Sequence, residues 1–379
     1  MKLRGVVLKK VLLINEGYSD NLGDQAIKYS IQKMLERKNV QVNFQDFTRL
    51  KQEEFDYQDT VSSEKYRDMN MKKRKNFFLK MKFFLSMVKW TINSVKRSIL
   101  EIKGGNYDLI IIGGGQLILS NKKFPLSMFI WVITAKIFSR AKIKLFGVGA
   151  GSDFSFFEKL LYRYSFKFMD EVYLRDAASI EYIQKNFKIT SKYVPDPVFA
   201  ISNFHELKMK KSKRVLIGIV DFKVFKRYNN NQISEEKYIE YWEDRVKEFQ
   251  NDGYDVKLFF TTIADRQQTI KFQQKIKEET GIDLEILISA NLFELLDSIS
   301  TSSVIISARM HALIIGYSYN LTVIPYVISD KIKSFKSEYL ETTTTKEELS
   351  NLIFKSIDEV LDEHYEENSH LYSSKVYKL

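Results

Sequence analysis

The chain has 379 residues, of which 44% are hydrophobic and 28% charged, so it is long and apolar enough for two domains with separate cores. It contains no cysteine, which excludes disulfides, thiolate catalysis and cysteine-ligated metals, and its four histidines show no spacing typical of a metal site. The first residues do not have the pattern of a signal peptide. The most apolar stretch, residues 124–138, is shorter than the roughly 20 residues that a membrane-spanning helix needs. We therefore expect a cytoplasmic protein.

Positive charge is concentrated in one segment. Residues 65–103 contain twelve Lys and Arg but only two acidic residues, so they account for nearly all of the formal net charge of +11. Their apolar residues keep helical spacing, which predicts a basic amphipathic helical insert. One apolar stripe is typical of a face packed on a core: Phe77, Met81, Phe84, Leu85, Val88, Ile92, Val95 and Ile99. A second stripe lies on nearly the opposite side: Leu79, Phe83, Met87 and Trp90.

The second stripe leaves three interpretations of the insert open. Lysines beside exposed aromatic residues suit an anionic membrane, which residues 75–99 would contact from the inner face of the cell membrane. A helix that is buried on two sides, or that lies at a subunit interface, has the same pattern. Nucleic acid is the third possible partner, and we do not expect it because no DNA- or RNA-binding motif accompanies the patch. The oligomeric state is not specified by the sequence.

Outside the insert, short apolar runs alternate with helical patterns. This alternation predicts the α/β class, with two Rossmann-like doubly wound domains that face a cleft. A polar, basic stretch follows Ser202, so we assign residues 1–202 to the first domain and residues 203–379, with a closing helix near the end, to the second. The strands expected in the two domains are 10–15, 108–112, 144–148, 171–174, 215–220, 256–261, 284–287, 304–307 and 322–326.

Basic side chains follow several of these strands. Ligands of doubly wound sheets bind outside the carboxyl ends of the strands. Arg309 and His311 open a helix there, where backbone N–H groups and the helix dipole favour an anion. Lys331 follows the next strand, and Arg175 follows a strand of the first domain. Simpler roles remain open, namely a histidine satisfied by the backbone, a solvated lysine, and an ion pair of Arg175 with Asp176 or Glu181.

Small and polar residues form the loops at the same strand ends. The first loop holds Asn21, Gly23 and Asp24, and Asp24 is expected either to cap the next helix or to face a sugar hydroxyl across the cleft. Glycine clusters at 113–115 and 149–151 match neither the dinucleotide fingerprint nor the P-loop. They predict tight turns with positive φ, or backbone that approaches a ligand closely.

Six motifs occur in order along the chain: NLGDQAI (21–27), DLIIIGGGQLI (108–118), GVGAG (147–151), YLRDAASIEYI (173–183), VPDPVF (194–199) and SARMHALIIGYSYNLTVIPYVISDK (307–331). Together they resemble the polysaccharide pyruvyl transferase family, whereas residues 40–103 match no pattern of it. The resemblance implies a fold like the GT-B glycosyltransferases. It also implies transfer of a pyruvyl group from phosphoenolpyruvate to two hydroxyls of a sugar in a bacterial-type surface polysaccharide, such as an exopolysaccharide or capsule, or in its lipid-linked precursor. A cyclic ketal would form and phosphate would be released.

The resemblance implies roles for these residues. Phosphoenolpyruvate carries a phosphate and a carboxylate, and Arg175, Arg309 and Lys331 can supply the cations that it needs, from both domains. His311 is the expected acid that protonates the methylene carbon, and Asp24 is expected to orient the acceptor or accept a hydroxyl proton. No metal or organic cofactor is needed. The loop residues expected to contact the acceptor, or to bring backbone close to ligands, are Asn21, Gly23, Gly114, Gly115 and Gly149.

Two other functions fit the same pattern. A GT-B glycosyltransferase that uses a nucleotide sugar would have similar domains and would be stabilised by a nucleoside diphosphate. A non-catalytic saccharide-binding or membrane-associated protein would keep the fold without the activity. The joint presence of Arg175, Arg309, His311 and Lys331 argues against such a loss.

Overall fold

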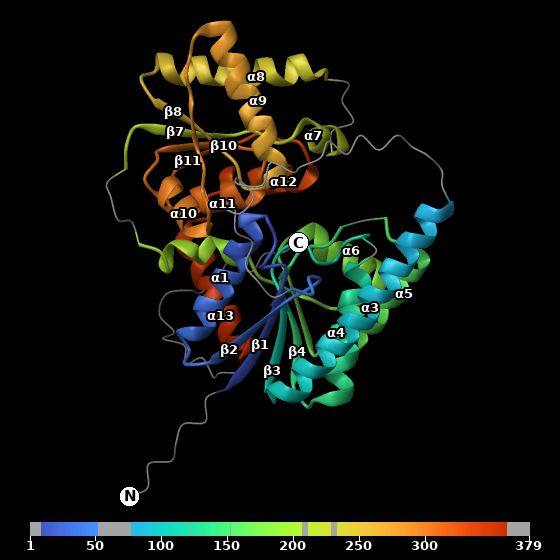
Figure 1. Ribbon diagram of the computed structural model, residues 1–379. Coiled ribbons are helices and arrows are strands. Elements are labelled where there is room, and N and C mark those ends of the chain that lie inside the picture. Colours follow the sequence, from blue (N-terminus) through green and yellow to red (C-terminus); the bar gives the residue numbers. More distant parts are fainter. Residues whose placement is uncertain are drawn as a thin grey trace, which may run out of the picture.

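The computed structural model describes residues 9–51, 77–121, 123–151, 153–206, 211–228 and 233–361, of which 77–80 are described by their backbone only. These residues form two parallel sheets with helices on both faces (Figure 1). The first sheet has the order β2-β1-β3-β4-β5-β6 and the second the order β11-β10-β7-β8-β9. The predicted α/β class with two doubly wound units is therefore confirmed.

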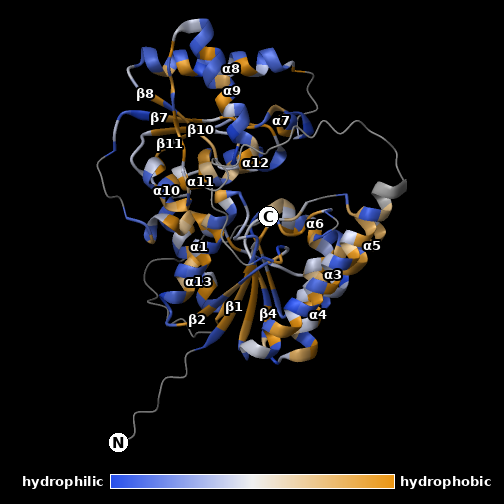
Figure 2. Ribbon diagram, in the orientation of Figure 1, coloured by the Kyte–Doolittle hydropathy of each residue, from blue (hydrophilic) through white to orange (hydrophobic). Residues whose placement is uncertain are grey.

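The central strands are buried aliphatic runs, because helices cover both faces of a parallel sheet. Figure 2 shows the hydrophobic residues gathered on the strands and on the helix sides nearest to them. The strands of the first sheet are β1 (Lys10–Asn15), β2 (Gln41–Asp46), β3 (Leu109–Gly113), β4 (Lys142–Val148), β5 (Glu171–Leu174) and β6 (Lys192–Tyr193). Those of the second are β7 (Arg214–Gly218), β8 (Asp255–Phe259), β9 (Glu285–Leu287), β10 (Val304–Ser307) and β11 (Thr322–Pro325). The sequence pattern does not predict β2 and β6, because these edge strands of the first sheet lack a continuous apolar run.

Each sheet lies between two helical layers. One face of the first sheet packs against α3 (Phe77–Gly105), α4 (Phe124–Phe138), α5 (Phe156–Lys167) and α6 (Ala177–Phe187). Its other face packs against α1 (Leu22–Glu36), the 3-10 helix η1 (Pro197–Asn203) and α13 (Lys346–Val360). The second sheet packs on one face against α7 (Phe222–Tyr228), α8 (Glu235–Asn251) and α9 (Ile263–Thr280). Its other face packs against α10 (Leu292–Ser300), α11 (Met310–Ser318), α12 (Asp330–Phe335) and the π-helical turn η2 (Lys336–Leu340).

The closing helix α13 returns to the first sheet. It packs against η1 and α1, and near its end Asp358 forms an ion pair with Lys38. The ammonium group of Lys144 in β4 lies 3.5 Å from the carbonyl oxygen of Glu359. The sequence analysis assigns this helix to the second domain because of its position in the chain, whereas in the structure it packs against elements of the first.

The layer between the two sheets is one continuous core. Apolar residues of α1 and η1 share a buried cluster with those of α10 and α11. The Leu22 N–H donates a hydrogen bond to the Thr261 carbonyl at 3.0 Å, and the rings of Phe199 and Tyr339 are 4.7 Å apart. This packing fixes the carboxyl ends of both sets of strands around a common space.

The insert helix is α3, and residues 65–76 of the predicted insert lie outside the described residues. The stripe that we expected on the core is wrong over much of its length, because Phe84, Leu85 and Ile92 are 65%, 59% and 50% exposed. The buried positions instead recur every four residues: Trp90, Ser94, Ser98 and Ile102. Within the described helices, none is long and apolar enough to pass through a bilayer.

Small polar residues explain the different orientation of α3. Ser98 Oγ is 3.1 Å from Thr134 Oγ1 of α4, so the two helices approach closely through hydroxyl groups. The Trp90 indole N–H donates to the Thr48 carbonyl at 2.9 Å, which removes Trp90 from the surface. Hydrophobic periodicity does not count serines as core residues, so it predicts the wrong face of α3 to be buried.

Candidate active site in the cleft

A cavity of about 200 Å³ lies where the carboxyl ends of the two sheets meet. Of the residues selected from the sequence, those that line it are Asn21, Asp24, Gly114, Gly115, Arg175, Arg309, His311 and Lys331. Residues that the sequence analysis did not select also line it, among them Asn15, Glu16, Gln116 and Thr261. The fold thus gathers groups from six strand-to-helix connections, three after β1, β3 and β5 of the first sheet and three after β8, β10 and β11 of the second.

The two selected glycines that do not line the cavity lie directly behind its side chains. A Cβ on Gly23 would come within 2.4 Å of Nδ1 of His311, and a Cβ on Gly149 within 2.7 Å of Nε of Arg175. Gly114 and Gly115 have φ of +74° and +75°, so the predicted tight turn is confirmed. Gly23 and Gly149 therefore matter here because they leave room for His311 and Arg175.

Asp24 is not the N-cap of α1, which corrects one of the two expectations for it. Asn21 is the cap, and its side-chain oxygen accepts a hydrogen bond from the Gly23 N–H at 3.0 Å. Asp24 lies in the first turn, faces the cavity, and accepts a hydrogen bond from Ser19 Oγ at 3.0 Å. Burial raises the pKa of Asp24, although the charge of His311 and the hydrogen bond from Ser19 oppose this effect.

Arg175 and His311 share one buried carboxylate. Arg175 follows β5 and donates through Nη1 to Oδ2 of Asp196 at 2.9 Å, and Nε2 of His311 is 3.6 Å from the same oxygen. Burial alone would raise the pKa of Asp196, but the nearby imidazole and guanidinium outweigh it and lower this pKa to about 2. The ion pair that was considered for Arg175 is thus made chiefly with Asp196, and Asp176 lies farther away at 3.6 Å.

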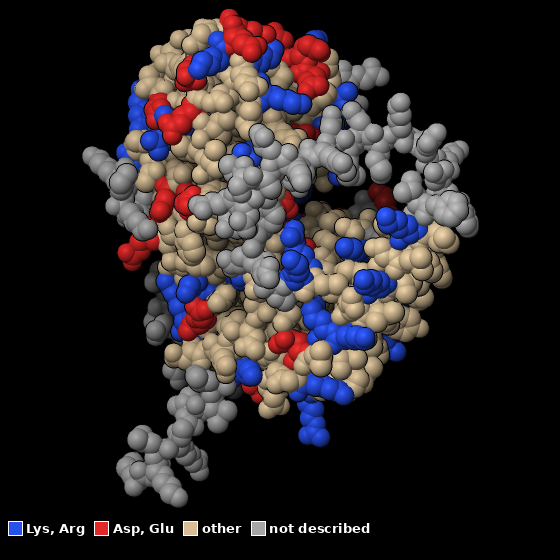
Figure 3. Space-filling model, viewed as in Figure 1, with Lys and Arg blue, Asp and Glu red and all other residues tan. Residues whose placement is uncertain are grey.

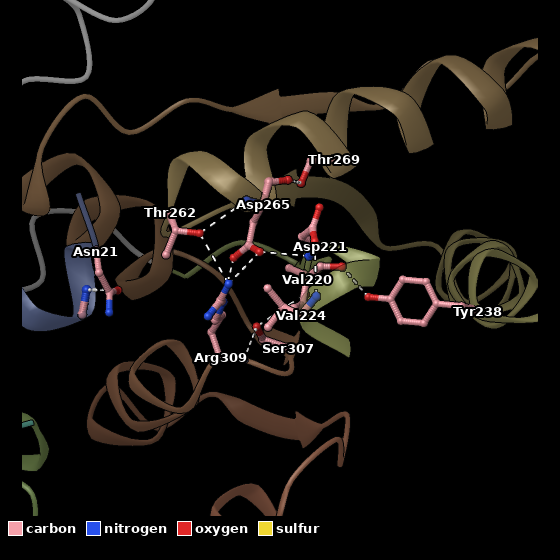
Figure 4. A network of polar contacts seen from close by, with 12 residues as sticks. Asn21, Val220, Asp221, Val224, Tyr238, Thr262, Asp265, Thr269, Ser307 and Arg309 are labelled. Carbon is pink, nitrogen blue, oxygen red and sulfur yellow. Dashed lines mark hydrogen bonds and ion pairs between the residues drawn. The ribbon is translucent and has the colours of Figure 1, made fainter. Parts of the chain in front are cut away.

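Arg309 is held by a second buried aspartate. Figure 4 shows its guanidinium directed at Asp265 in the first turn of α9. Nε and Nη2 of Arg309 donate to the two carboxylate oxygens at 2.7 and 2.8 Å, which is a bidentate pair. Asp265 is 1% exposed and also accepts a hydrogen bond from the Asp221 N–H at 3.0 Å. Much of the hydrogen-bonding capacity of Arg309 is therefore already in use.

Lys331 is the second residue of α12, at the mouth of the cavity. Its side chain keeps contact with solvent along part of its length. Desolvation of the ammonium group in the cleft, together with the charges of Arg175 and Arg309, lowers its pKa to about 8. Lys331 is therefore charged at neutral pH and loses its proton at only moderately alkaline pH.

Glu16 is an acid that the sequence analysis missed. It directly follows β1, and its carboxyl group lines the cavity near Asp46, the last residue of β2. Burial, reinforced by the charge of Asp46, raises the pKa of Glu16 to about 8. Its position after a strand could have identified Glu16, since the same criterion selected Arg175. No sequence signal links Asp265 to Arg309, because they come from separate loops.

Comparisons with known proteins identify the family and the fold. The family model for polysaccharide pyruvyl transferase matches residues 21–330. Comparison with curated protein sequences gives no match. The solved structures similar to this chain include UDP-GlcNAc 2-epimerase from Methanocaldococcus jannaschii, with 10% identity and a TM-score of 0.53 over 91% of this chain and 92% of that one. Another is the UDP complex of MnaA from S. aureus, with 12% identity and a TM-score of 0.50 over 94% and 88%.

At such low identity these two structures establish only the fold, which is the GT-B-like arrangement of two domains. The family match covers most of the chain and includes the loops that carry Asp24, Arg175, Arg309 and His311. The chain belongs to the polysaccharide pyruvyl transferase family.

Proposed function

We propose that this protein transfers a pyruvyl group from phosphoenolpyruvate to two hydroxyls of a saccharide, with formation of a cyclic ketal and release of phosphate. One observation carries the proposal beyond family membership. Three cationic side chains and one imidazole, contributed by both sheets, surround a single cavity: Arg175, Arg309, Lys331 and His311. A small substrate with two anionic groups suits such a cavity.

In the donor complex, the phosphate and carboxylate would be bound chiefly by Arg175 and Lys331. Asp196 uses one nitrogen of Arg175, which leaves other N–H groups for an anion. Arg309 would add its remaining N–H groups while Asp265 holds the guanidinium in place. This division refines the role expected for Arg309 from the sequence, since the arginine is both a ligand and part of a buried ion pair.

The first chemical step is a proton transfer to carbon. His311 donates a proton to the methylene carbon of phosphoenolpyruvate, and the double-bond electrons form the new C–H bond. The neighbouring carbon gains oxocarbenium character, and the first saccharide hydroxyl attacks it. Asp24 accepts the proton of that hydroxyl, and the raised pKa of this carboxyl makes it a better base than an exposed aspartate. Asp196, whose Oδ2 lies 3.6 Å from Nε2 of His311, would position the imidazole for this transfer.

The second step closes the ketal. The bond between the central carbon and the phosphate oxygen breaks, and the phosphate departs with the electron pair while Arg175 and Lys331 stabilise its charge. The second hydroxyl attacks the same carbon, and its proton leaves with the phosphate. Glu16 keeps its proton at neutral pH, so it can donate a hydrogen bond to a saccharide oxygen.

A thermal-shift titration tests the donor first. Phosphoenolpyruvate should raise the melting temperature in a saturable manner, and more than phosphate or pyruvate does. Arg175→Ala should abolish that rise, whereas Lys237→Ala, a change at an exposed residue of α8, should leave it intact. Release of phosphate that depends on an added saccharide acceptor would then establish the transfer.

A different outcome would reject the proposal. Stabilisation by UDP alone, with no response to phosphoenolpyruvate, would indicate a nucleotide-sugar enzyme of the same fold. Stabilisation by a saccharide without phosphate release in the presence of phosphoenolpyruvate would indicate a non-catalytic binding protein.

A further inference from the structure

The outer face of α3 is a basic and apolar surface that the proposed chemistry does not use. Four exposed lysines follow one another at seven-residue intervals, which is close to two helical turns, so they form a single row: Lys82, Lys89, Lys96 and Lys103. Aliphatic and thioether side chains flank the row with exposed fractions of 44%, 59%, 40%, 50% and 74%: Met81, Leu85, Val88, Ile92 and Leu100. We call these nine residues the lysine face of α3.

No carboxylate of α3 neutralises the lysine face. Glu101 is the one acidic residue between positions 77 and 105, and it points inward, where it accepts hydrogen bonds from Gln45 at 2.7 Å and from the Tyr107 hydroxyl. Figure 3 shows Lys and Arg spaced over this side of the molecule with uncharged residues between them. The surface is therefore complementary to negative charge, and it also exposes more apolar area than purely ionic contact needs.

The N-terminal part of α3 projects beyond the first sheet. The ammonium group of Lys123, just before α4 begins, lies 5.4 Å from the centre of the Trp90 ring, so Trp90 is level with the start of α4. Residues 77–89 continue past this point for about 20 Å at the rise of an α-helix. They extend past the carboxyl edge of the sheet, the edge at which β1, β3 and β5 reach the cavity (Figure 1).

We propose that the lysine face of α3 docks on an anionic lipid bilayer. The lysine ammonium groups would lie among the headgroup phosphates while the neighbouring aliphatic side chains enter the interfacial region. A second copy of the chain suits this face poorly, because twofold pairing of the helix would set one lysine row against the other. Nucleic acid suits it less well, because the apolar residues along the lysine row are aliphatic side chains and a methionine, and the exposed rings of α3, Phe83 and Phe84, are confined to its N-terminal end.

Docking of the lysine face would place the bilayer surface next to the cavity. Because the projecting end of α3 and the cavity share one edge of the first sheet, the bilayer would lie beside the site. If the proposed function holds, the saccharide acceptor is then a lipid-linked one. Vesicle binding itself does not depend on that function, so the two proposals can fail separately.

Co-sedimentation of the full chain with vesicles tests the docking. The vesicles contain about 30 mol% phosphatidylglycerol in phosphatidylcholine, and salt is varied from about 0.05 to about 0.5 M. The charge-reversal variant is K82E/K89E/K96E. Its matched control is K237E/K247E/K271E, which makes the same change in net charge at exposed lysines of α8 and α9 in the second domain. A third variant, L85S/I92S, removes apolar contacts only.

We expect wild type and the control to bind anionic vesicles at low salt and to be released at high salt. K82E/K89E/K96E should lower the partition coefficient by about a hundredfold, and L85S/I92S should weaken binding at both salt concentrations. Both variants should keep the wild-type melting temperature and its response to phosphoenolpyruvate, because they change exposed residues only. Equal recovery of wild type and K82E/K89E/K96E with the vesicles would overturn the proposal. So would a dimer, or binding of an oligonucleotide, that wild type shows without vesicles and K82E/K89E/K96E loses.

Discussion

The two sheets contribute unlike groups to the cavity. The first sheet side holds carboxyl groups whose pKa values are raised, Glu16 and Asp24, whereas the second side holds Arg309, His311 and Lys331. Arg175 belongs to the first side, but Asp196 joins it to His311 of the second. Carboxyl groups with raised pKa values therefore gather on the first side and most of the cationic groups on the second, and Asp196 links the two sides through Arg175 and His311. In the proposed reaction, the donor anion would lie between Arg175 and Lys331, and the acceptor hydroxyls would face Asp24 and Glu16.

The largest effect is expected from the residue that acts between the two sides. His311→Ala should lower kcat by about 10²–10⁴-fold, because general acid catalysis contributes that much. Steady-state phosphate release measures the rate. His311→Gln keeps the volume of the side chain without its acid function and should be as slow. Turnover within a few-fold of wild type in either variant would remove His311 from the chemistry.

Arginines on opposite sides should respond differently to replacement by lysine. Arg175→Lys should raise KM for phosphoenolpyruvate by roughly 10–100-fold, since hydrogen bonds to a charged partner are lost and lysine cannot form a guanidinium fork. Arg309→Lys should affect KM less but lower the stability by roughly 2 kcal/mol, because it breaks the bidentate pair with buried Asp265. Denaturant unfolding and KM, measured for both variants, separate the two effects. The reverse ranking would mean that Arg309 is the main anion ligand.

The positions of these groups were predictable in part. The sequence predicts that the cationic residues lie at the same edge, because each follows a strand of a doubly wound sheet and the carboxyl ends of such strands lie together. These residues are Arg175, Arg309 and Lys331. The acids that hold the arginines, Asp196 and Asp265, could not be predicted, because the partner of a buried charge depends on tertiary packing. The exposed face of α3 was misjudged for the same reason: its contact with α4 uses serines, which hydrophobic periodicity ignores.

Lys331 gives the second side a pH dependence that should be measurable. Its pKa of about 8 means that the ammonium is charged at pH 7 and neutral at pH 9, so affinity for phosphoenolpyruvate should fall by about tenfold for each pH unit above 8. Lys331→Arg should keep the affinity constant over this range, because a guanidinium stays protonated. Binding is measured above pH 7, where the phosphate of the ligand is already a dianion. A fall that is equally steep in Lys331→Arg would trace the pH dependence to another group.

Glu16 should give the first side a smaller effect of its own, seen in stability rather than in rate. The pKa of this carboxyl is raised from 4.5 to about 8 by folding, so the folded state holds a proton between these pH values that the unfolded state has released. Folded stability should therefore be greatest below about pH 4.5 with respect to this group and fall as pH rises toward 8, by at most about 1.4 kcal/mol per pH unit. Glu16→Gln mimics the protonated carboxyl and should lessen that fall, so that the variant matches wild type at pH 5 and exceeds it at pH 8. The stability gained by Glu16→Gln should be reduced by Asp46, because burial also raises the pKa of this neighbouring carboxyl and its charge adds to the shift at Glu16. Denaturant unfolding of wild type and Glu16→Gln at pH 5, 6.5 and 8 gives the free energy of unfolding of each protein at each pH. If this free energy depends on pH equally in both proteins, Glu16 is ionised in the cavity and acts there as an anion.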